Sequence, residues 1–426
     1  MIGDSSPSGG AGDLRRGWCP DLHRPMASGD GWLLRVKPSH SRLTAAQARA
    51  LAGIARTHGN GIVELTARGN LQLRGLTEAD ARALPPGLVS LGLGSPDPEV
   101  ERRRSILVSP LAGIDPACDD ATLRIASVLE TELNGAAELR SLPDKFGFAV
   151  DGGGLLPLSQ MTADVVLRAS PGGWRIEAGG GRATPRQQDA NALASLAIRV
   201  ARAAGSLPRR LAQDPAPGLA LLRSLGLETR SRDAVGETAP SVERPPAAVG
   251  PIGALAMGVL LPGGQGNAGL LERLADAADG AGNGLLALTP WRSIVLPLAV
   301  GASFPAMAGM LGGLILDPEH PARFVRACAG RGGCPRGLAD VRTDASRLAA
   351  LLGRDAMREL GVLHLSGCRK GCAHPAPAQA TLVAEAGGYG LVLGGTAGDE
   401  AAATGLSIAA AAVRLREVAA GARNRR

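Results

Sequence analysis

Hydrophobic and polar positions change their period several times within the first ninety residues. The apolar run at 32–36 predicts a short strand, and alanines and leucines at helical spacing predict a helix over 43–56. A turn sequence at 58–61 leads into a second predicted strand at 62–65. Apolar and polar residues then alternate through the last part of 66–74. The pattern predicts a small unit built from strands and one helix.

The same order of elements returns in the second half of the chain. A strand is predicted at 254–261 and a helix at 270–278. The sequence Gly-Asn-Gly-Leu-Leu-Ala-Leu-Thr at 282–289 then matches Gly-Asn-Gly-Ile-Val-Glu-Leu-Thr at 59–66, with no gap between the first and the last position. Such a match at a fixed offset indicates an internal repeat.

A later pair of segments supports the repeat. The residues at 164–167 and 174–176 resemble those at 381–384 and 389–391, in the same order. Two matches in the same order indicate duplication. We therefore predict an α+β protein of two halves related by a pseudo-two-fold axis, each with a small unit followed by a larger one.

Two further stretches complete this organisation. The segment 205–249 is rich in proline and has little periodicity, so it is predicted to be a linker. The alanine-rich stretch 406–419 is predicted to be an amphipathic helix packed on the second half.

Composition limits the classes of partner. The chain has a net charge of +7, 46 basic residues of which only three are lysine, and 2% aromatic residues. Single-stranded nucleic acid is normally bound by basic grooves with stacking aromatics, so nucleic acid is a poor fit. Arginines that grip a polycarboxylate small molecule fit better, because guanidinium pairs bidentately with carboxylate.

The compartment is inferred from what the sequence lacks. Residues 1–13 contain no apolar segment of the kind found in signal peptides, and no run is long enough to span a membrane. We expect a cytoplasmic protein with reduced thiols that binds neither membrane nor nucleic acid.

Four of the six cysteines fall in two short glycine-rich segments. Cys328 and Cys334 form a C-x5-C pair, and Cys368 and Cys372 form a C-x3-C pair. Four thiolates are what a [4Fe–4S] cluster requires. Zinc also takes four cysteines, usually in pairs two to four residues apart, and redox-active or unligated cysteines are a third interpretation. The spacing favours the cluster and leaves the other interpretations open.

One glycine motif has another explanation. The segment 264–269 matches G-x-G-x-x-G between a predicted strand and helix, as in dinucleotide-binding proteins. Such a site needs an acidic residue at the end of the next strand, and 285–288 contains none. A tight turn is the better interpretation.

The cysteine pattern, in the second half of a duplicated α+β chain, resembles the nitrite/sulfite reductase family. In that family each half has a ferredoxin-like small unit and a larger unit, and four cysteines hold a [4Fe–4S] cluster beside a sirohaem. The resemblance implies that the four cysteines named above are the cluster ligands, with Cys372 in the position that bridges to the haem iron.

The resemblance extends to three segments of the first half. The segment 65–68, with Gln72, is similar to the Thr-x-Arg segment of the family's active site. The segment 104–113 looks like its second arginine segment, with Ser105 in place of the usual Asn. The segment 142–147 looks like the one that carries two substrate lysines, but only Lys145 remains and Gly147 takes the second place. Fewer cations suit a small oxyanion less well.

One branch of that family, the precorrin-3B synthases, resembles this chain more closely than the reductases do, including where the chain departs from the reductase pattern. The sequence motifs of this branch resemble six segments of this chain: Cys19-Pro20, Arg24-Pro25-Met26, 65–75, 142–151, 288–292 and 364–375. This resemblance implies oxygen-dependent hydroxylation of precorrin-3A at C20 with lactone formation, in aerobic cobalamin biosynthesis. The tetrapyrrole would lie where the reductases hold sirohaem.

The site residues implied by this resemblance are few. Arg68, Arg104 and Lys145 are the catalytic candidates, and Arg68, Arg74, Arg104, Lys145, Arg292 and His374 are the substrate-binding candidates.

The resemblance also implies partners and a second metal. The branch implies a separate mononuclear non-haem iron, whose ligands the sequence does not locate, and an electron donor, either reduced nicotinamide through a reductase or a ferredoxin. The alternatives are a sirohaem-dependent sulfite or nitrite reductase and a non-catalytic iron–sulfur electron carrier.

Pattern and resemblance together divide the chain into seven parts. They are a disordered tail (1–18), the first ferredoxin-like half-domain (19–90), the first reductase-like domain (91–204), a linker (205–249), the second ferredoxin-like half-domain (250–305), the cluster-binding reductase-like domain (306–395) and a C-terminal helix (396–426).

Overall fold

The computed structural model describes residues 19–231 and 247–423. The described residues divide into two compact units, one within 20–323 and one within 324–423, and Cys19 is grouped with the second. No helix in the described ranges is long and apolar enough to cross a membrane. The predicted tail at 1–18 lies outside the described residues.

Two five-stranded sheets form the centre of the unit 20–323, and each contains one strand from the other half of the chain. The first sheet has the order β1 (Met26–Ser28), β2 (Gly31–Val36), β5 (Leu71–Leu76), β4 (Ile62–Leu65) and β14 (Gln265–Asn267). The second has the order β12 (Gly250–Ile252), β13 (Ala256–Leu260), β16 (Ser293–Pro297), β15 (Leu285–Leu288) and β3 (Arg42–Thr44).

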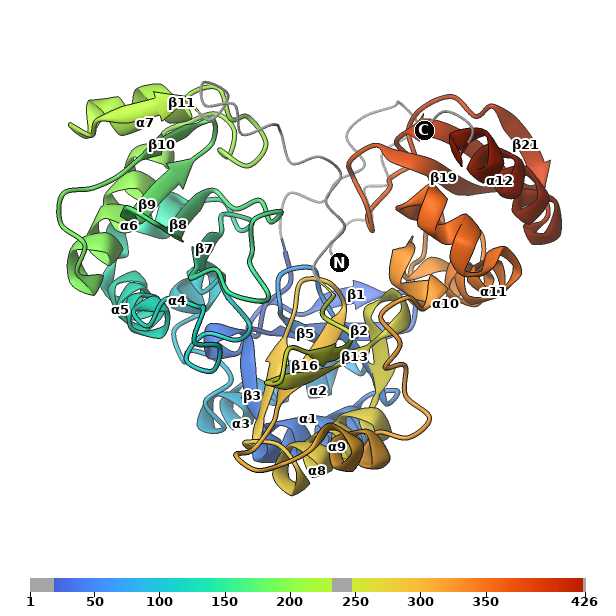
Figure 1. The fold of residues 1–426 in the computed structure, drawn as a ribbon, viewed down its shortest axis with the longest axis horizontal. Helices are drawn as coiled ribbons and strands as arrows, with labels where there is room; N and C mark the ends of the chain where they lie inside the picture. The colour runs from blue at the N-terminus through green and yellow to red at the C-terminus, as the bar shows by residue number, and fades with distance from the viewer. Residues whose placement is uncertain (1–18, 232–246, 424–426) are drawn as a thin grey trace, which may run out of the picture. The chain divides into compact units, whose positions relative to one another are not determined.

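The exchange of strands is reciprocal. Strand β3 of the first half pairs antiparallel with β15, and β14 of the second half pairs antiparallel with β4. Each exchanged strand runs directly into the helix of its own half, α1 (Ala45–His58) or α8 (Ala268–Gly280). These two helices pack against each other beneath the sheets (Figure 1). Their apolar faces share one hydrophobic core with both sheets.

The fixed offset of the repeat also relates the residues that cap α1 and α8. Thr44 caps the N-terminus of α1 and Asn267, its counterpart at that offset, caps α8, each by accepting the backbone N–H of the third residue that follows it. The predicted strands and helices of both small units are present. The predicted pseudo-two-fold α+β fold is confirmed.

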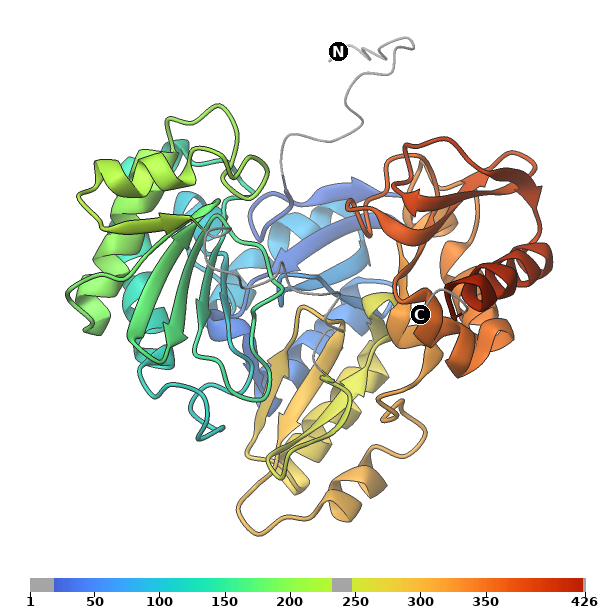
Figure 2. The ribbon, with the colours of Figure 1, turned by 45° about the horizontal axis from the view of Figure 1, so that its top comes forward.

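A six-stranded sheet forms the larger part of the first half. Its order is β11 (Thr229–Ser231), β10 (Gly181–Ala183), β9 (Gly173–Ala178), β8 (Val165–Ser170), β7 (Phe148–Asp151) and β6 (Ile106–Val108), with β6, β7 and β8 parallel. Helices α5 (Thr122–Gly135) and α6 (Ala190–Ala204) pack together over this sheet (Figure 2). They bury its apolar side chains.

The unit 324–426 repeats that arrangement. Its sheet has the order β17 (Val325–Ala327), β18 (Leu363–Ser366), β19 (Ala378–Glu385), β20 (Gly388–Gly395) and β21 (Ala403–Leu406), again with the first three strands parallel. Helices α11 (Val341–Leu360) and α12 (Ile408–Arg423) pack together over this sheet. The predicted match between 164–176 and 381–391 corresponds to the hairpins β8–β9 and β19–β20.

The remaining helices are short. They are α2 (Glu78–Ala83), α3 (Pro85–Ser90), α4 (Pro98–Arg103), α7 (Gly218–Ser224), α9 (Phe304–Met310) and α10 (Gly330–Gly333).

Two of the predicted segments have more structure than the sequence indicated. Within the segment predicted as a linker, 205–249, α7 packs beside β10, and β11 pairs with β10. At the glycine motif 264–269 the turn lies at its start, where Gly264 and the preceding Gly263 have positive φ, and Gln265–Asn267 forms the exchanged strand β14. The boundaries of the predicted domains stay predictions.

Candidate functional site

Arg68 lies in a tight loop between β4 and β5. The Thr66 hydroxyl accepts hydrogen bonds from the backbone N–H groups of Arg68, at 3.3 Å, and Asn70, at 3.2 Å. Gly69 has a φ of +64°, and a Cβ there would lie 2.7 Å from the Ser41 hydroxyl oxygen. Only glycine fits this place without strain. The loop is therefore fixed by its own sequence, with Arg68 half-buried at its tip.

Gly147 brings three predicted segments together. A Cβ built on Gly147 would lie 3.8 Å from the Arg68 guanidinium nitrogen Nη1 and 3.8 Å from both the carbonyl and the hydroxyl oxygen of Ser105. Gly147 and Ser105 are adjacent because β6 and β7, which follow them, are parallel neighbours. The structure therefore places the three family segments of the first half around one point, and no side chain projects there from Gly147.

Lys145, two residues earlier, is half-buried. Its ammonium makes no hydrogen bond or ion pair with any residue that the structure describes. Its carbonyl oxygen accepts a hydrogen bond of 2.5 Å from Arg210. The backbone is tied while the cation remains available.

Arg104 has a different surrounding. Its guanidinium donates to Glu101 at 2.9 Å, to Glu130 at 2.7 Å and to the Ser39 hydroxyl at 3.0 Å. Desolvation raises the pKa of Glu101, against the opposing charges of Lys37 and Arg104. Every nitrogen of the guanidinium donates to a group within the chain, so Arg104 holds α4 to α5, and its substrate-binding role stays a prediction.

Arg74 is also buried among carboxylates. It contacts Asp30 at 2.7 Å and Glu64 at 3.1 Å, with its side chain 4% exposed. Burial by itself would raise the pKa of Asp30, but the Arg74 guanidinium more than offsets this and holds that pKa below its usual value. The pair ties the β1–β2 turn to β5. A contact between Arg74 and substrate stays a prediction.

Arg292 has an unusual backbone conformation. Its φ is +63°, in the left-handed region that non-glycine residues rarely adopt. The turn is the counterpart of the Arg68 loop: Thr289, which corresponds to Thr66 in the repeat, accepts hydrogen bonds from the N–H groups of Trp291 and Ser293. Arg292 then takes the place of Gly69. An arginine kept in a conformation that favours glycine is typical of a functional position.

The four predicted cluster cysteines follow the ends of β17 and β18. Cys328 comes directly after β17, and its sulfur accepts a hydrogen bond of 3.2 Å from the backbone N–H of Gly367, directly after β18. Desolvation of its sulfur raises the pKa of the Cys372 thiol, although the residue is exposed, and Cys328, Cys368 and Cys334 raise it further while Lys370 opposes them. The other three cysteines therefore lie within electrostatic reach of Cys372.

The loops between these cysteines are packed through glycines. A Cβ on Gly337 would lie 2.3 Å from the carbonyl carbon of Gly330, and one on Gly367 would lie 3.4 Å from the Cys328 sulfur. Leu338 N–H donates to the Gly367 carbonyl at 2.9 Å, which ties the two loops together. A larger residue at 337 would displace the backbone of the loop that follows Cys328.

The donor set suits a cluster better than a single ion. No three His, Cys, Asp or Glu side chains of the described residues are placed so that they could hold one metal ion together. In a [4Fe–4S] cluster each thiolate binds a different iron, so its ligands surround the cluster at a distance from one another. Four free cysteines on two glycine-rich loops, with a backbone N–H donating to one sulfur, fit that group.

His374 lies beside the cluster segment. Its N–H donates to the Gly371 carbonyl at 3.2 Å, and its ring lies edge-on to that of the buried His364, with 5.9 Å between centroids. The structure therefore gives His374 a fixed place next to Cys372. Its role toward substrate stays a prediction.

The first half contains a copy of the cysteine loops in which Ser109 takes the place of Cys328. Ser109 follows β6 as Cys328 follows β17, and Gly152 follows β7 as Gly367 follows β18. The Gly152 N–H donates to the Ser109 hydroxyl at 3.0 Å, which repeats the bond from Gly367 to Cys328. In this copy Asp115 accepts the Leu155 N–H at 2.6 Å. Polar side chains complete the loop here.

Cys118 belongs to that copy and Cys19 does not. Cys118 is 2% exposed, and desolvation raises the pKa of its thiol. Its sulfur lies 3.7 Å from the Thr122 hydroxyl. Cys19 is half-buried. Neither is near enough to the four cluster cysteines in sequence to be assigned to their loops.

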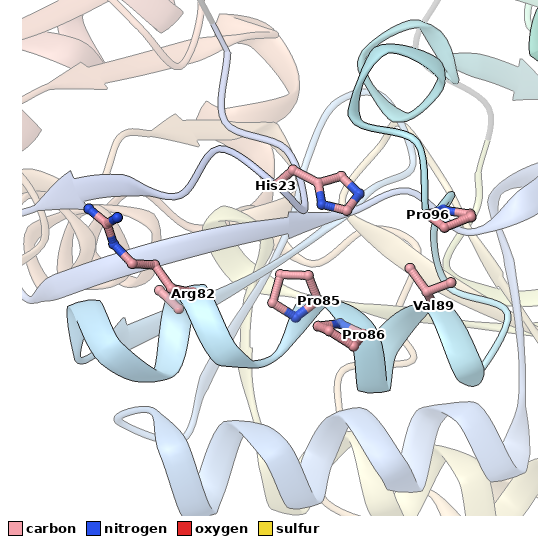
Figure 3. A pocket seen from close by; sticks show the side chains of 7 residues that line it. His23, Arg82, Pro85, Pro86, Val89 and Pro96 are labelled. Atoms are coloured by element: carbon pink, nitrogen blue, oxygen red, sulfur yellow. The ribbon is translucent and has the colours of Figure 1, made fainter.

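A groove of about 460 Å³ lies elsewhere on the unit 20–323. It is lined by His23, Ala81, Arg82, Pro85, Pro86, Val89 and Pro96, along α2 and α3 (Figure 3). None of the predicted site residues lines it. We assign it no role.

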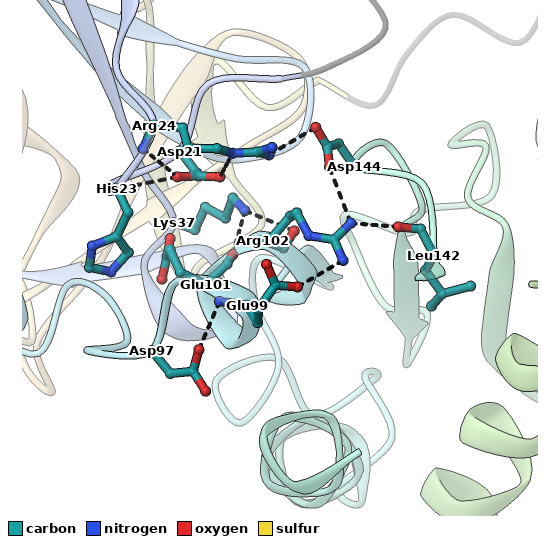
Figure 4. A network of polar contacts seen from close by, with 10 residues as sticks. All are labelled: Asp21, His23, Arg24, Lys37, Asp97, Glu99, Glu101, Arg102, Leu142 and Asp144. Carbon is teal, nitrogen blue, oxygen red and sulfur yellow. Dashed lines mark hydrogen bonds and ion pairs between the residues drawn. The ribbon is translucent and has the colours of Figure 1, made fainter. Parts of the chain in front are cut away.

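A network of ion pairs that the sequence did not indicate holds the Lys145 segment. Asp144 accepts hydrogen bonds from Arg24 and Arg102, which lie far from it in the sequence (Figure 4). The available signal was the Arg24-Pro25-Met26 segment, which the resemblance singled out without a role.

Comparison with known proteins places these features in one family. The model of the nitrite/sulfite reductase ferredoxin-like half domain matches residues 24–86 and 252–312, the two small units. A chloroplastic ferredoxin–nitrite reductase of Oryza sativa subsp. japonica is 30% identical over 33% of this chain and 24% of its own length. The solved NirA protein of Mycobacterium tuberculosis matches with a TM-score of 0.64 and 20% identity, over 86% of this chain and 74% of that one, and supports the fold.

One relative matches nearly the whole chain. A protein named precorrin-3B synthase from Sinorhizobium sp is 33% identical, over 93% of this chain and 86% of its own length. A match of this extent includes most of both halves. The chain therefore belongs to the precorrin-3B synthase family, a branch of the nitrite/sulfite reductase family.

Proposed function

We propose that this protein is a precorrin-3B synthase. It is an oxidoreductase of the monooxygenase type, which hydroxylates precorrin-3A at C20 with lactone formation in aerobic cobalamin biosynthesis. One atom of O2 enters the tetrapyrrole, and the other leaves as water with two electrons and two protons from a donor. The observation that carries the proposal is the 33% identity to the Sinorhizobium protein of that name over 93% of this chain.

The surroundings of Gly147 support a large substrate. Reduction of a small oxyanion requires several cations that converge on it and supply protons. Here the place beside Arg68 and Ser105 has no side chain from residue 147, so it offers room and one cation fewer. Such a place suits the edge of a tetrapyrrole with carboxylate side chains better than nitrite or sulfite.

The substrate contacts we propose differ in how free their cations are. The Lys145 ammonium is available among the described residues, and it would pair with an acetate or propionate group of the substrate. Arg68 and Arg292 lie in corresponding turns of the two small units. Arg74 and Arg104 already bind carboxylates of the chain, so they would support the site through β5 and α4.

We propose that Cys328, Cys334, Cys368 and Cys372 hold a [4Fe–4S] cluster. The cluster, when bound, relays electrons one at a time to the oxygen reaction. The Gly367 N–H, which donates to the Cys328 sulfur, would stabilise a thiolate there.

A mononuclear non-haem iron normally needs two histidines and a carboxylate with open positions. The described residues contain no such group of three ligands, so no step is assigned to this iron. The expected cytoplasmic location and the electron donor, reduced nicotinamide through a reductase or a ferredoxin, are also parts of the proposal.

The test is incubation of cluster-containing protein with precorrin-3A, a reductant and ¹⁸O2. We expect a product heavier by one oxygen atom that carries the label, detected by mass spectrometry. A matched sample under argon should give none. Absence of an oxygenated product from protein with a full complement of iron and sulfide would contradict the proposal.

A visible spectrum separates the main alternative. The nitrite reductases among the relatives favour a sirohaem enzyme as the second candidate. Sirohaem gives strong Soret absorption that a cluster alone lacks. We expect cluster absorption without a Soret band; a strong Soret band together with nitrite or sulfite reduction would favour the reductase, and a cluster without activity on any of these substrates would favour an electron carrier.

A further inference from the structure

Lys145 combines an available cation with a fixed backbone. Its ammonium has no partner among the residues that the structure describes, whereas the peptide groups around it are bound. The Phe146 N–H donates to the Pro143 carbonyl at 2.8 Å, which closes a turn around Lys145. Because the backbone is already fixed, only the lysine side chain has to be ordered when its ammonium binds an anion.

The C-terminal side of this turn is held by Asp164 and Arg210. The buried Asp164 carboxylate accepts hydrogen bonds from the Gly147 N–H at 2.9 Å and from Arg210 at 3.0 Å. Arg210 donates with the same nitrogen to the Lys145 carbonyl at 2.5 Å. This side is therefore tied to the start of β8.

The N-terminal side is held by the carboxylate of Asp144. One oxygen accepts a hydrogen bond of 2.8 Å from Arg24, and the other accepts one of 3.2 Å from Arg102 (Figure 4). Arg102 also donates to the Leu142 carbonyl at 2.6 Å. The Asp144 side chain is only 11% exposed. Both of its oxygens are directed at arginines.

Each of the two arginines is itself fixed. The buried Asp21 carboxylate accepts the Arg24 N–H at 2.8 Å and the Arg24 Nε at 3.1 Å. The Lys37 ammonium, 7% exposed, donates to the Arg102 carbonyl at 3.2 Å and to the Glu101 carbonyl at 2.6 Å. Arg24 and α4 therefore form a rigid frame for Asp144.

The frame affects Lys145 through charge as well as position. Asp144 is the residue next to Lys145, and a carboxylate released from the arginines would compete for its ammonium. Opposite charges within about 4–6 Å attract strongly enough to change which ion pair forms. While Arg24 and Arg102 bind both carboxylate oxygens, the Lys145 ammonium stays available to another anion.

We propose that Arg24 is a positioning residue for Lys145. Through Asp144 it fixes the turn at 142–147 and keeps the Lys145 ammonium free for a carboxylate of the substrate. Arg24 itself touches no substrate. That this carboxylate belongs to precorrin-3A rests on the proposed function. The positioning of Lys145 by Arg24 does not depend on that function.

The chain offers a close control for the test. The Arg24 side chain is 41% exposed and bridges Asp21 and Asp144, and the Arg49 side chain is 40% exposed and bridges Asp276 and Asp279. Arg24→Gln and Arg49→Gln therefore remove guanidinium groups of nearly equal exposure, each of which bridges two aspartates, from the same unit. Only the first is connected to Lys145.

The first measurement is the affinity of cluster-containing protein for precorrin-3A under argon, where no turnover occurs. We expect Arg24→Gln to weaken binding about tenfold, the size of one lost charge-assisted contact, and Arg49→Gln to leave it unchanged. In a Lys145→Met background, Arg24→Gln should cause no further loss, because both changes remove the same contact. Additive losses in the two backgrounds would overturn the proposal.

The second measurement needs no substrate. The chain has only three lysines, Lys37, Lys145 and Lys370, so protein labelled with ¹³C at the lysine Cε alone gives three side-chain signals. Substitution of each lysine by arginine assigns them. We expect Arg24→Gln to shift the Lys145 signal while the Lys370 signal stays in place, and Arg49→Gln to move none. The Lys37 signal does not decide the question, because the Asp21 carboxylate that loses Arg24 also acts on the Lys37 ammonium.

The two measurements separate the two proposals. Should the unmodified protein fail to bind precorrin-3A, the proposed function falls, and the lysine spectra alone decide on Arg24. An unchanged Lys145 signal in Arg24→Gln would overturn the positioning role whatever the substrate. A shift of all three signals with a lower melting temperature would also overturn it, since Arg24 would then stabilise the protein as a whole and not the Lys145 turn.

Discussion

Gly147 determines how much room the candidate site has. Its missing side chain faces Arg68 and Ser105, each at a distance of ordinary van der Waals contact from a Cβ placed on its backbone. Its φ lies outside the left-handed region, so another residue can adopt its backbone. A side chain at this position would therefore enter the site without unfolding its loop.

Gly147→Lys tests this interpretation of the site. We expect a melting temperature within a few degrees of the unmodified protein and a loss of precorrin-3A turnover of at least tenfold, because the new side chain fills the space beside Arg68. Gly172→Lys adds the same charge in the exposed β8–β9 turn, where a Cβ meets nothing within 4 Å, and should leave turnover unchanged. Full turnover in Gly147→Lys would show that substrate does not occupy this place.

Arg292 offers a test of strain at a single residue. Its left-handed backbone costs roughly 1 kcal/mol relative to glycine, which occupies the corresponding position as Gly69. Arg292→Gly should therefore keep or slightly raise the melting temperature, while the affinity for precorrin-3A falls. Unchanged affinity together with lower stability would assign Arg292 to the fold instead.

The sequence indicated the positions of some site residues but not the surroundings of others. The positions of Arg68, Ser105 and Gly147 could be inferred from short segments because each loop is fixed locally, by Thr66 or by the parallel strands that follow. The surroundings of Arg104 could not. Glu130, one of its two carboxylate partners, lies on α5, and no local pattern shows that α4 and α5 meet there.

At the scale of elements, the β1–β2 turn depends on one buried ion pair. Arg74 on β5 binds Asp30 in the turn, and both side chains are largely buried. A carboxylate whose pKa is lowered in the folded state stabilises the fold above its unfolded pKa, and this contribution is lost as the pH falls through the folded value. The Asp30 pKa is lowered in this way.

Asp30→Asn should therefore lower the free energy of unfolding by about 1–2 kcal/mol at pH 7. The difference from the unmodified protein should shrink as the pH falls below about 4, where Asp30 becomes protonated first in the unfolded and then in the folded state. Urea unfolding of both proteins at a series of pH values measures this difference in the free energy of unfolding. Effects of pH that are common to both proteins cancel in the difference. A difference that stays constant down to pH 2 would contradict the assignment of the stabilisation to this charge.

The cysteine loops permit a second test at this scale. Cys372→Ser should lose most of the bound iron and sulfide, because one of the four thiolates is removed. Cys118→Ala removes a buried thiol from the corresponding loops of the first half and should keep both. Iron and sulfide analysis with the visible spectrum gives the result. A full cluster in Cys372→Ser would refute the ligand assignment.

Strand exchange is the element that the sequence did not predict. The fixed offset of the repeat predicted which segments correspond, and β3 and β14 do correspond. Each is very short and has no apolar run, and each pairs with a strand that belongs to the other half of the chain. Local periodicity carries no information on such a partner.

At the scale of the molecule, the exchange makes the two small units one body. The hydrophobic core is continuous across both sheets, α1 and α8. Two separately encoded fragments, one that ends at Ser231 and one that begins at Ala247, should therefore associate when they are produced together and remain poorly soluble when they are produced alone. Co-purification through a tag on either fragment measures this. Two fragments that fold and stay apart would show that the halves are independent.

The matching loops of the two halves have a consequence for variants of the predicted ligands. The Gly152 N–H donates to the Ser109 hydroxyl as the Gly367 N–H donates to the Cys328 sulfur, so this strand–loop geometry accommodates a hydroxyl in the place of a sulfur. A serine in place of Cys328 should therefore keep the bond from Gly367. Any loss of bound iron in that variant would then report the missing thiolate and not a collapsed loop.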